Sequence, residues 1–397
     1  MPRLSGIAPA SALDPSSKGA APIRAAVSHA EEESAVVREL AAEIDPRRTS
    51  FLLVFPHDGL DPDALAAALR AELSGIPVFG CTTAGQITPA GYESSACLAL
   101  IFDRAHFRCA SLLVDPLAPV SMGAILAQAR RLDARFPRSA HWRRLGLTFT
   151  DGLSLQEDML AAALAAALPE IPIFGGSAGD GLSFRETRVL HGGAFHRNAA
   201  LLLLVETDLD FVGLGFDHFN PTDCRMVVTR AVPEARLVLE LNGSPAAAEY
   251  ARLVGCPVEA LSPRVFAENP VLVRNNAVYH VRAIQSVAED GALSFLSAID
   301  DGLPLVLGRS ADILETLAGA LAVRDVAGRA PDFVLGFDCV LRRLEIEAKG
   351  LSAAASRILA EGRVTGFNTY GEQHYGLHVN QTFVGVAFFA PAGRAAA

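Results

Sequence analysis

The sequence has little positive charge and no basic block. Its 34 Lys and Arg residues are outnumbered by 44 Asp and Glu residues, and the formal net charge is −10. Binding to a nucleic acid or to an anionic membrane surface depends on clustered Lys and Arg side chains that neutralise phosphates. We therefore expect neither a nucleic acid nor a membrane as a partner.

Regular cysteine spacing and long apolar runs are also missing. The six cysteines include no CxxC pair, which favours reduced, mostly buried thiols over a disulfide framework or a zinc site. No apolar run reaches the ~20 residues that span a bilayer, and the N-terminus has no signal-peptide core. These absences predict a cytoplasmic protein.

Apolar residues, in contrast, are plentiful enough for large cores. Hydrophobic residues make up 51% of the sequence and charged residues 20%. The 397 residues are long for one domain. We expect a mobile tail and a lead-in helix (Ser28–Ile44) within residues 1–45, one domain over 46–241 and a second over 242–397. The boundary follows from an Asn-Gly turn and a proline within 241–246, which open an alanine-rich helix.

A strand that ends in a glycine-rich loop occurs three times. The first copy spans residues 76–87, the second 171–181 and the third, which is more diverged, 364–372. A strand and a helical segment precede each copy, and in the third the predicted helix is Val340–Leu359. Recurrence of this kind predicts repeated βαβ-type units. The expected fold class is therefore α/β with two domains.

Motifs along most of the chain, from about residue 46 to 391, resemble those of FIST sensory proteins. They lie at 79–85, 174–181, 242–246 with Glu249 and Tyr250, 369–372 and 378–382. The resemblance implies that 46–241 is a FIST N-terminal domain and that 242–397 is a FIST C domain. It also implies an intracellular sensor of small ligands that acts in signal transduction.

The three glycine-rich loops form the predicted ligand site. In open α/β sheets, ligands bind beyond the carboxyl ends of strands, where loop amides and helix N-termini point outward. Glycines allow close approach of the backbone and hydroxyl groups donate hydrogen bonds, which suits a carboxylate; alternatively, the glycines only permit tight turns. The candidate ligand-binding residues are Gly80, Cys81, Thr82, Thr83, Gly85, Gly175, Gly176, Ser177, Gly179, Asp180, Thr369, Tyr370, Gly371 and Glu372.

Two carboxylates and one thiol in these loops have alternative interpretations. Asp180 and Glu372 can accept the ammonium group of an amino acid or cap a helix. Cys81 can be a reactive thiol or a buried, inert one. We do not expect an enzyme, because Cys81 has no His or Asp at a recognisable nucleophile spacing and the sequence has no Walker-type lysine motif and no HExxH. A cysteine-dependent hydrolase or transferase using Cys81 is the alternative of another class, and an adaptor without a ligand is a third.

Within the family, residues 337–342 and 378–382 resemble most closely the stand-alone branch proposed to bind haem and to report nitric oxide. That resemblance implies haem as a cofactor, and as a partner a histidine kinase or a cyclic-di-GMP enzyme (a diguanylate cyclase or phosphodiesterase). Haem iron needs an axial ligand, commonly His. The first candidate is His218, in an aromatic stretch, with His378 and His191 as alternatives, and for each a structural histidine is the other interpretation. Other FIST proteins are thought to bind amino acids or other small metabolites without haem.

Overall fold

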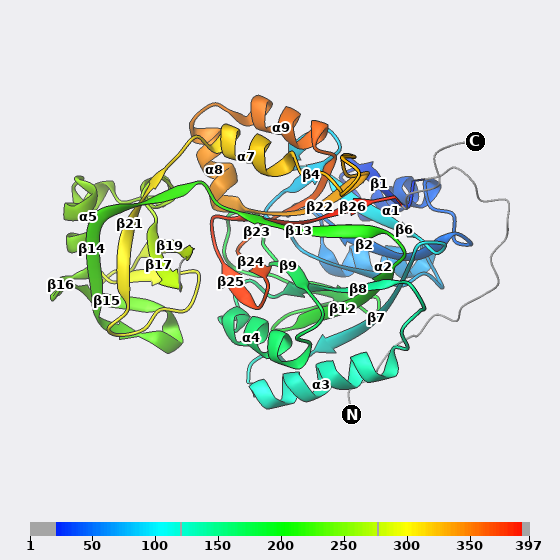
Figure 1. Ribbon diagram of the computed structural model, residues 1–397, viewed down its shortest axis with the longest axis horizontal. Coiled ribbons are helices and arrows are strands. Elements are labelled where there is room, and N and C mark those ends of the chain that lie inside the picture. Colours follow the sequence, from blue (N-terminus) through cyan, green and yellow to red (C-terminus); the bar gives the residue numbers. More distant parts are fainter. Residues whose placement is uncertain (1–20, 120, 276–277, 391–397) are drawn as a thin grey trace.

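Residues 21–119, 121–275 and 278–390 are described by a computed structural model, which shows a mixed α/β protein (Figure 1). Within these residues, three six-stranded sheets form the larger part, which we call the three-sheet body. An eight-stranded sheet forms the smaller part. This smaller part lies between β13 and α7 in the chain, over residues 217–312, and we call it the insert.

The three-sheet body repeats one order of elements three times: strand, helix, strand, helix, strand, hairpin, strand. The first unit contains β1 (Ile23–Ser28), α1 (Glu33–Ala42), β2 (Thr49–Phe55), α2 (Pro62–Glu72), β3 (Val78–Cys81), β4 (Gln86–Thr88), β5 (Gly91–Glu93) and β6 (Cys97–Asp103). The second contains β7 (Phe107–Val114), α3 (Met122–Arg135), β8 (Arg143–Thr150), α4 (Glu157–Ala167), β9 (Ile173–Ser177), β10 (Val189–His191), β11 (Ala194–His196) and β12 (Ala200–Thr207). The third contains β13 (Asp210–Phe216), α7 (Ile313–Leu321), β22 (Phe333–Cys339), α8 (Val340–Ala348), α9 (Ser352–Glu361), β23 (Val364–Thr369), β24 (Glu372–His374), β25 (Leu377–Val379) and β26 (Phe383–Phe389). The predicted βαβ-type repeats are thus confirmed.

Each unit donates its hairpin to the sheet of another unit. The strand orders are β1-β6-β2-β3-β10-β11, β7-β12-β8-β9-β24-β25 and β13-β26-β22-β23-β4-β5. The two central strands of each sheet are parallel, and the donated hairpin pairs antiparallel with the second of them. The hairpin of the first unit therefore completes the third sheet, that of the second completes the first, and that of the third completes the second. Every unit depends on the other two.

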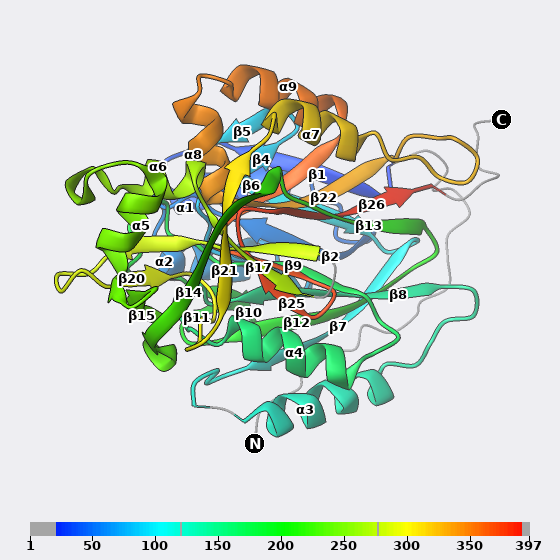
Figure 2. The same ribbon diagram turned by 60° about the vertical axis from the view of Figure 1, so that its left-hand side comes forward.

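The inner faces of the three sheets enclose one core. Phe55, Phe149 and Phe337 hold the same place in the three units, and Phe367 lies among them. The centroid of the Phe367 ring is 4.5, 6.0 and 5.6 Å from those three rings, distances typical of favourable aromatic pairs. On the outer faces, α1 and α2 cover the first sheet, α3 and α4 the second, and α7 and α9 the third. Figure 2 shows α3–α4 and α7–α9 on opposite sides of the strands.

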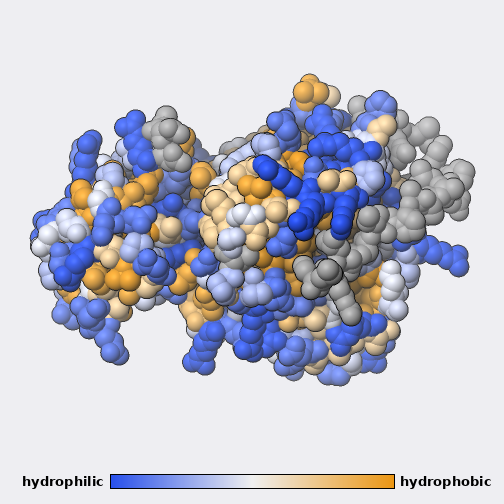
Figure 3. Space-filling view, turned by 90° about the horizontal axis from the view of Figure 1, so that it is seen from below, coloured by the Kyte–Doolittle hydropathy of each residue, from blue (hydrophilic) through white to orange (hydrophobic). Residues whose placement is uncertain are grey.

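The insert has an apolar core of its own. Its elements are β14 (Phe219–Val232), β15 (Leu237–Leu241), β16 (Ser244–Pro245), α5 (Ala246–Val254), α6 (Pro263–Glu268), β17 (Val271–Asn275), β18 (Val278–Arg282), β19 (Ile284–Val287), β20 (Leu293–Phe295) and β21 (Pro304–Ser310). Seen from below, the molecule narrows between the insert and the three-sheet body (Figure 3). A shared apolar cluster joins the two, with Leu272 and Val281 of the insert against Ala84 and Tyr370 of the glycine-rich loops. The insert therefore covers the end of the body that carries these loops. The boundary placed at residues 241 and 242 stays a prediction.

The lead-in segment differs from its prediction. Residues 23–28 form β1, and α1 begins at Glu33, so the predicted helix Ser28–Ile44 starts too early. The hydroxyl of Ser28 donates to the Glu39 carboxylate at 2.6 Å instead of capping the helix. Strand β1 forms because it pairs along its whole length with β6, a partner that local sequence does not reveal. The predicted tail lies mostly in residues 1–20, outside the described residues.

The helix predicted over Val340–Leu359 is two helices, α8 and α9. Between them, Gly350 has φ = 69°. This left-handed conformation ends an α-helix, and glycine adopts it without the steric cost that a Cβ brings. The break lets α9 turn back over the third sheet, where Ala355 and Leu359 are buried.

Gly80, Gly175 and Gly366 hold equivalent places in the three parallel strand pairs. A Cβ built at each of them would lie 1.8 to 1.9 Å from a main-chain oxygen of the neighbouring strand. That distance is far below van der Waals contact, so each parallel pair requires a residue without a side chain at this place. For Gly80 and Gly175, this is a structural reason to be glycine that is independent of any ligand.

We predict that Gly175→Ala lowers the free energy of unfolding by about 3 kcal/mol or more, because its methyl group would overlap the Thr148 carbonyl. The matched control is Gly319→Ala in α7, where a Cβ has open space around it. This change is expected to stabilise the protein by at most ~1 kcal/mol, since alanine is the better helix former. Urea unfolding of both variants measures the difference, and equal stabilities would contradict the prediction.

Candidate functional site

The three glycine-rich loops meet at one end of the three-sheet body and hydrogen-bond to one another. The main-chain bonds run from the Gly179 amide to the Thr82 carbonyl (3.1 Å), from the Ser177 amide to the Gly371 carbonyl (2.7 Å), and from the Ala84 amide to the Asn368 carbonyl (2.9 Å). Each loop is therefore held by the other two. The hairpin exchange produces this arrangement, because every loop leads directly into a hairpin that crosses to another sheet.

Close packing between the loops requires some of their glycines. A Cβ at Gly179 would lie 2.8 Å from the Ala84 nitrogen, and one at Gly176 would lie 2.4 Å from the Thr369 methyl group. Both distances are too short for a real Cβ. The structural interpretation of these glycines is thus sufficient to explain them.

The hydroxyl groups of the first loop face other parts of the protein. The Thr82 hydroxyl accepts a hydrogen bond from the Arg188 amide at 3.0 Å, and the Thr83 hydroxyl donates to the Pro56 carbonyl at 2.9 Å. Cys81 is fully buried, and burial raises the pKa of its thiol well above the ordinary value. A thiol that stays protonated is a poor nucleophile. This disfavours a cysteine-dependent hydrolase or transferase.

Asp180 caps the turn that follows it. Its carboxylate accepts hydrogen bonds from the main-chain amides of residues 184–186 at 2.7 to 2.9 Å, and another from the Tyr370 hydroxyl. The Tyr370 ring stacks on Phe184 with the centroids 4.4 Å apart. A carboxylate has about four acceptor positions. Little capacity is left for the ammonium group of a ligand.

Glu372 is fully buried among hydroxyl groups. Its carboxyl group accepts hydrogen bonds from the Thr369 hydroxyl and from the amide (3.2 Å) and hydroxyl of Thr382. Burial raises the pKa of Glu372 to about 8. The carboxyl group is therefore mostly protonated at neutral pH and carries little charge for a ligand.

A pocket of about 310 Å³, which we call the loop pocket, opens beside the loops and α8. Its lining residues are Asp58, Ala84, Gly85, Ser94, Gly181, Leu182, Val340, Arg343, Leu344 and Glu347. Arg343 pairs with Glu347 (Nε to Oε1, 2.7 Å) and donates to the Asn368 side chain at 3.2 Å. Asp58 is exposed on the facing turn, and a Cβ at Gly181 would touch its carboxylate. The loop pocket thus presents the Arg343–Glu347 ion pair on α8 and the Asp58 carboxylate on another wall.

Helix α8 also fastens the insert to the three-sheet body. At the start of the insert, His218 is buried, with Nε2 2.9 Å from Glu345 and Nδ1 2.8 Å from Arg342. Since Arg342 can only donate, Nδ1 is the acceptor and Nε2–H donates to Glu345. At the end of the insert, the Ser310 hydroxyl donates to Glu345 at 2.6 Å. Both connections of the insert therefore end on one helix.

The other two histidines singled out in the sequence lie elsewhere. The ring nitrogens of His378 are 3.4 Å from the Gln373 side chain and from the Leu296 carbonyl. His191 lies on β10 with Nε2 3.0 Å from the Ser111 hydroxyl, and burial lowers its pKa to about 4. Each of the two has a structural partner, and neither lines the loop pocket.

Asp58 and Arg343 were not among the residues selected from the sequence. Asp58 follows a strand of the first unit, and Arg343 lies on a helix of the third unit. The two residues line one pocket because the loops of the units meet there. An Asp in a turn and an Arg on a helix are too common to be a signal on their own. Over the part of the chain that is described, no group of three or more His, Cys, Asp and Glu residues could hold a metal ion. In the same residues, every helix is too short or too polar to cross a membrane.

Comparison with known protein families gives two adjacent matches. The model of the FIST N domain matches residues 17–244, which is more than half of the chain, and the model of the FIST C domain matches residues 246–374. A comparison with curated proteins finds no match.

The raised pKa of Glu372 predicts a pH dependence of stability. Its value of about 8 in the folded protein lies above the ordinary value of 4.5, so the folded state binds this proton more tightly than the unfolded state. Its contribution to stability is complete below about pH 4.5 and is lost as the pH rises toward 8, by at most about 1.4 kcal/mol per pH unit. Glu372→Gln stays neutral and is expected to lack this loss. Urea unfolding of both proteins between about pH 5 and 8 measures it, and parallel curves would refute the prediction.

Proposed function

Because the chain belongs to the FIST family, whose domains are small-ligand-binding sensory domains of signal transduction, we propose that it senses a small zwitterion of the amino-acid class in the loop pocket. The observation that carries the proposal is the placement of the Arg343 guanidinium, which is paired with Glu347, and of the Asp58 carboxylate on separate walls of the pocket. The volume of about 310 Å³ is at the lower end of the range of small-molecule sites. Sensing, rather than catalysis, is also consistent with the buried Cys81 thiol.

Of the three charged groups that line the pocket, Arg343 and Asp58 suit the two ends of an amino acid, and Glu347 is the present partner of Arg343. The Arg343 guanidinium can bind a carboxylate by two parallel hydrogen bonds, and the exposed Asp58 carboxylate can accept from an ammonium group. The N-terminus of α8, at Val340, also lines the loop pocket and favours a negative group. The apolar side chains of Leu182 and Leu344 are left for the rest of the ligand.

Helix α8 supplies a path from the ligand to the insert. Arg343 on this helix lines the loop pocket, while its neighbour Arg342 and the nearby Glu345 hold His218. A ligand that accepts a hydrogen bond from Arg343 competes with the hydrogen bond from Arg343 to Asn368. Ligand binding therefore changes which position of α8 is favoured. If the insert has two positions, the ligand favours one of them by its difference in affinity. The position of the insert is then the output of the sensor.

The output passes to a partner protein in this proposal. The sequence resemblance implies a histidine kinase or a cyclic-di-GMP enzyme, and a surface that changes with the position of the insert would be the contact. This step is supported by the interface between the insert and the body, which would rearrange if the insert moved. The interface includes ion pairs from Arg236 to Glu157 (2.6 Å) and to Asp158 (3.1 Å).

Haem-based sensing of nitric oxide, which the resemblance also implies, is less well supported at the three histidines selected for it, His218, His378 and His191. The preferred axial ligand His218 has both ring nitrogens engaged, by Arg342 and Glu345, and its side chain is completely buried. His378 is buried with both ring nitrogens near protein groups, and His191 is bonded to Ser111. Coordination of iron by His218 would require breaking two buried, charge-assisted hydrogen bonds. We therefore place a metabolite ahead of haem as the ligand.

The amino-acid proposal predicts a thermal shift. Wild-type protein is scanned with each of the common amino acids at a concentration far above a micromolar Kd. A bound compound at about 100 times its Kd adds about 2.7 kcal/mol to the free energy of unfolding, which corresponds to several degrees in Tm. Asp58→Asn and Arg343→Gln are expected to abolish the shift. The exposed Arg357→Gln on α9, outside the pocket, is the control and keeps it. A shift that survives in Asp58→Asn, or none in the wild type, rejects the loop pocket as this site.

Haem binding is tested by spectral titration. We expect ferric haem added to the purified protein to give the spectrum of free haem, because His218 remains bonded to Arg342 and Glu345. A stoichiometric Soret band that moves with nitric oxide and is lost in His218→Ala would show that the buried contacts do open and that haem is the ligand.

A further inference from the structure

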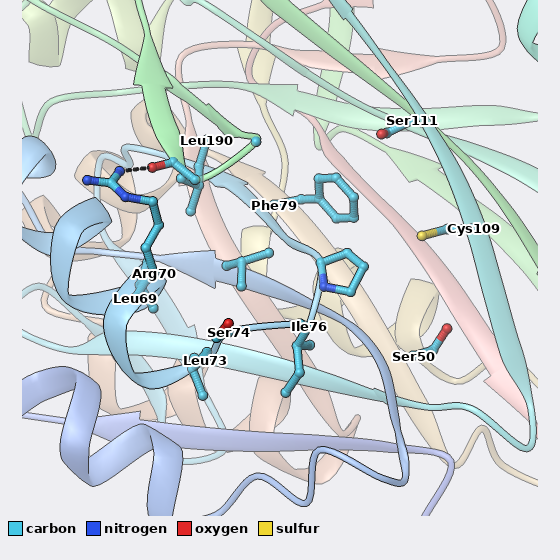
Figure 4. Close-up of a pocket in the computed structure, with 15 residues that line it drawn as sticks. Ser50, Leu69, Arg70, Leu73, Ser74, Ile76, Phe79, Cys109, Ser111 and Leu190 are labelled. Atoms are coloured by element: carbon cyan, nitrogen blue, oxygen red, sulfur yellow. Dashed lines mark hydrogen bonds between the residues drawn. The ribbon is translucent and has the colours of Figure 1, made fainter. Parts of the chain in front are cut away.

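A larger pocket, of about 490 Å³, lies at the opposite end of β3 from the loop pocket. The loop pocket borders on Gly85, which follows β3 in the chain. This pocket borders on residues 74–79, which comprise the segment before β3 and the first two residues of the strand. We call it the entry pocket. Its other walls are the end of α2, strand β7 and the turn between β10 and β11 (Figure 4). It lies where the hairpin donated by the second unit meets the first sheet.

At the equivalent junction of the second sheet stands an aromatic side chain that is 61% exposed, Tyr375. There, His374 of the donated hairpin pairs with Phe174, and Tyr375 follows in the hairpin turn. The rings of Tyr375 and Phe174 meet edge to face at 5.5 Å. A Cβ at Gly213 of β13 would lie 3.1 Å from the Tyr375 hydroxyl. Tyr375 thus lies beside Phe174 and β13 at the solvent side of the junction.

The first sheet has glycine where the second has this tyrosine. His191 is equivalent to His374, and Phe79 is equivalent to Phe174. The ring centroids of His191 and Phe79 are 5.8 Å apart. The next residue, Gly192, leaves open space, with no atom within 4 Å of a built Cβ. Gly192 is exposed, so the place that Tyr375 occupies in the second sheet is open at the rim of the entry pocket in the first.

A second small residue enlarges the same cavity. On β7, Cys109 pairs with Val205, whereas at the equivalent place on β13 the larger Phe211 pairs with Phe388. The side chain of Cys109 points into the entry pocket (Figure 4). Gly192 and Cys109 are thus small where the equivalent residues, Tyr375 and Phe211, are bulky. Both small residues line the entry pocket. At the entry pocket, the small size of both residues leaves room for a ligand.

The lining of the entry pocket restricts what can occupy it. The walls are mainly apolar and include the aromatic face of Phe79. The apolar lining residues are Leu69, Leu73, Ile76, Pro77, Val78, Phe79 and Leu190. Arg70, exposed at the end of α2, is the cation among the lining residues and donates one hydrogen bond to the Gly193 carbonyl. Its guanidinium group has five N–H donors, so it can bind an anion as well.

We propose that the entry pocket is a second ligand site, which takes a small aromatic or branched apolar molecule with a single carboxylate. The apolar part lies against Phe79 and Leu190, and the carboxylate binds Arg70 at the solvent side. The Ser111 hydroxyl, bonded to His191, provides one polar contact at the inner wall. The proposal is independent of the loop pocket, because the two pockets share no lining residue.

The probes are 1-naphthylacetate and its neutral counterpart 1-naphthylacetamide, titrated calorimetrically into the full chain. We expect one site for the acid. Arg70→Gln should weaken binding of the acid about tenfold and leave that of the amide unchanged, because only the acid forms a charge-assisted hydrogen bond. Arg38→Gln on α1, an exposed arginine outside the pocket, is the matched control and changes neither.

Filling the cavity is the decisive test. Gly192→Tyr and Cys109→Phe introduce at the pocket the larger side chains found at the equivalent places, Tyr375 and Phe211, and both should abolish binding of both probes. Gly192→Tyr is expected to fold, because Gly192 has φ = 61° and Tyr375 already holds φ = 47° in the same place. Thermal unfolding confirms that each variant is folded. Wild-type affinity in a folded Gly192→Tyr variant, or no binding of either probe to the wild type, overturns the proposal.

One further variant separates this site from the loop pocket. Asp58→Asn should leave 1-naphthylacetate binding unchanged, and Gly192→Tyr should leave any amino-acid thermal shift unchanged. Loss of both activities in either variant would show that the pockets are not independent and would contradict this proposal. Failure of the amino-acid panel alone rejects only the loop pocket.

Discussion

Pairing of each hairpin with the sheet of another unit is the interaction on which the rest of the structure depends. A βαβ unit with two central parallel strands leaves the edge of its second strand unpaired, and unpaired edge groups are costly when buried. The hairpin of another unit satisfies this edge in each of the three sheets. Because the exchange is cyclic, no unit can complete its sheet alone. The rings of Phe55, Phe149, Phe337 and Phe367 then pack at the centre, where the three sheets face one another.

The same exchange explains why most polar groups of the glycine-rich loops are hydrogen-bonded within the protein. The three loops begin at the crossing points of the hairpins, so their amides, hydroxyls and carboxylates find partners in one another. Asp180 is occupied by a turn and by Tyr370, and Glu372 by Thr369 and Thr382. The loop pocket stays open at the periphery of the junction, where α8 and the turn after β2 supply Arg343 and Asp58. The loop motifs and the lining of the loop pocket therefore overlap only in part, at Ala84, Gly85 and Gly181.

The insert is attached by buried charges rather than by apolar packing alone. Arg342, Asp338, His218 and Glu345 have fully buried side chains and bond to one another in a chain. Removing one partner from such a group typically costs about 3 to 5 kcal/mol, because the remaining charge stays buried. A network of this kind holds one geometry firmly, and it changes only when several of its bonds change together. It is thus suited to a discrete shift of the insert between two positions, as a sensor requires.

The repeated βαβ units and the glycine-rich loops could be read from the sequence, because both follow from local patterns of apolar residues, helix formers and turn residues. Family membership, too, was evident from motifs such as 79–85 and 174–181, and two family models bear it out. Strand β1, the break at Gly350 and the hairpin exchange were not predicted, since which edge a short strand joins is decided by partners far away in the chain. The sequence by itself determined the units and their order. Only the tertiary structure decided which side chains became structural and where the loop pocket and the entry pocket lie, because both depend on how three interlocked sheets fill the space between them.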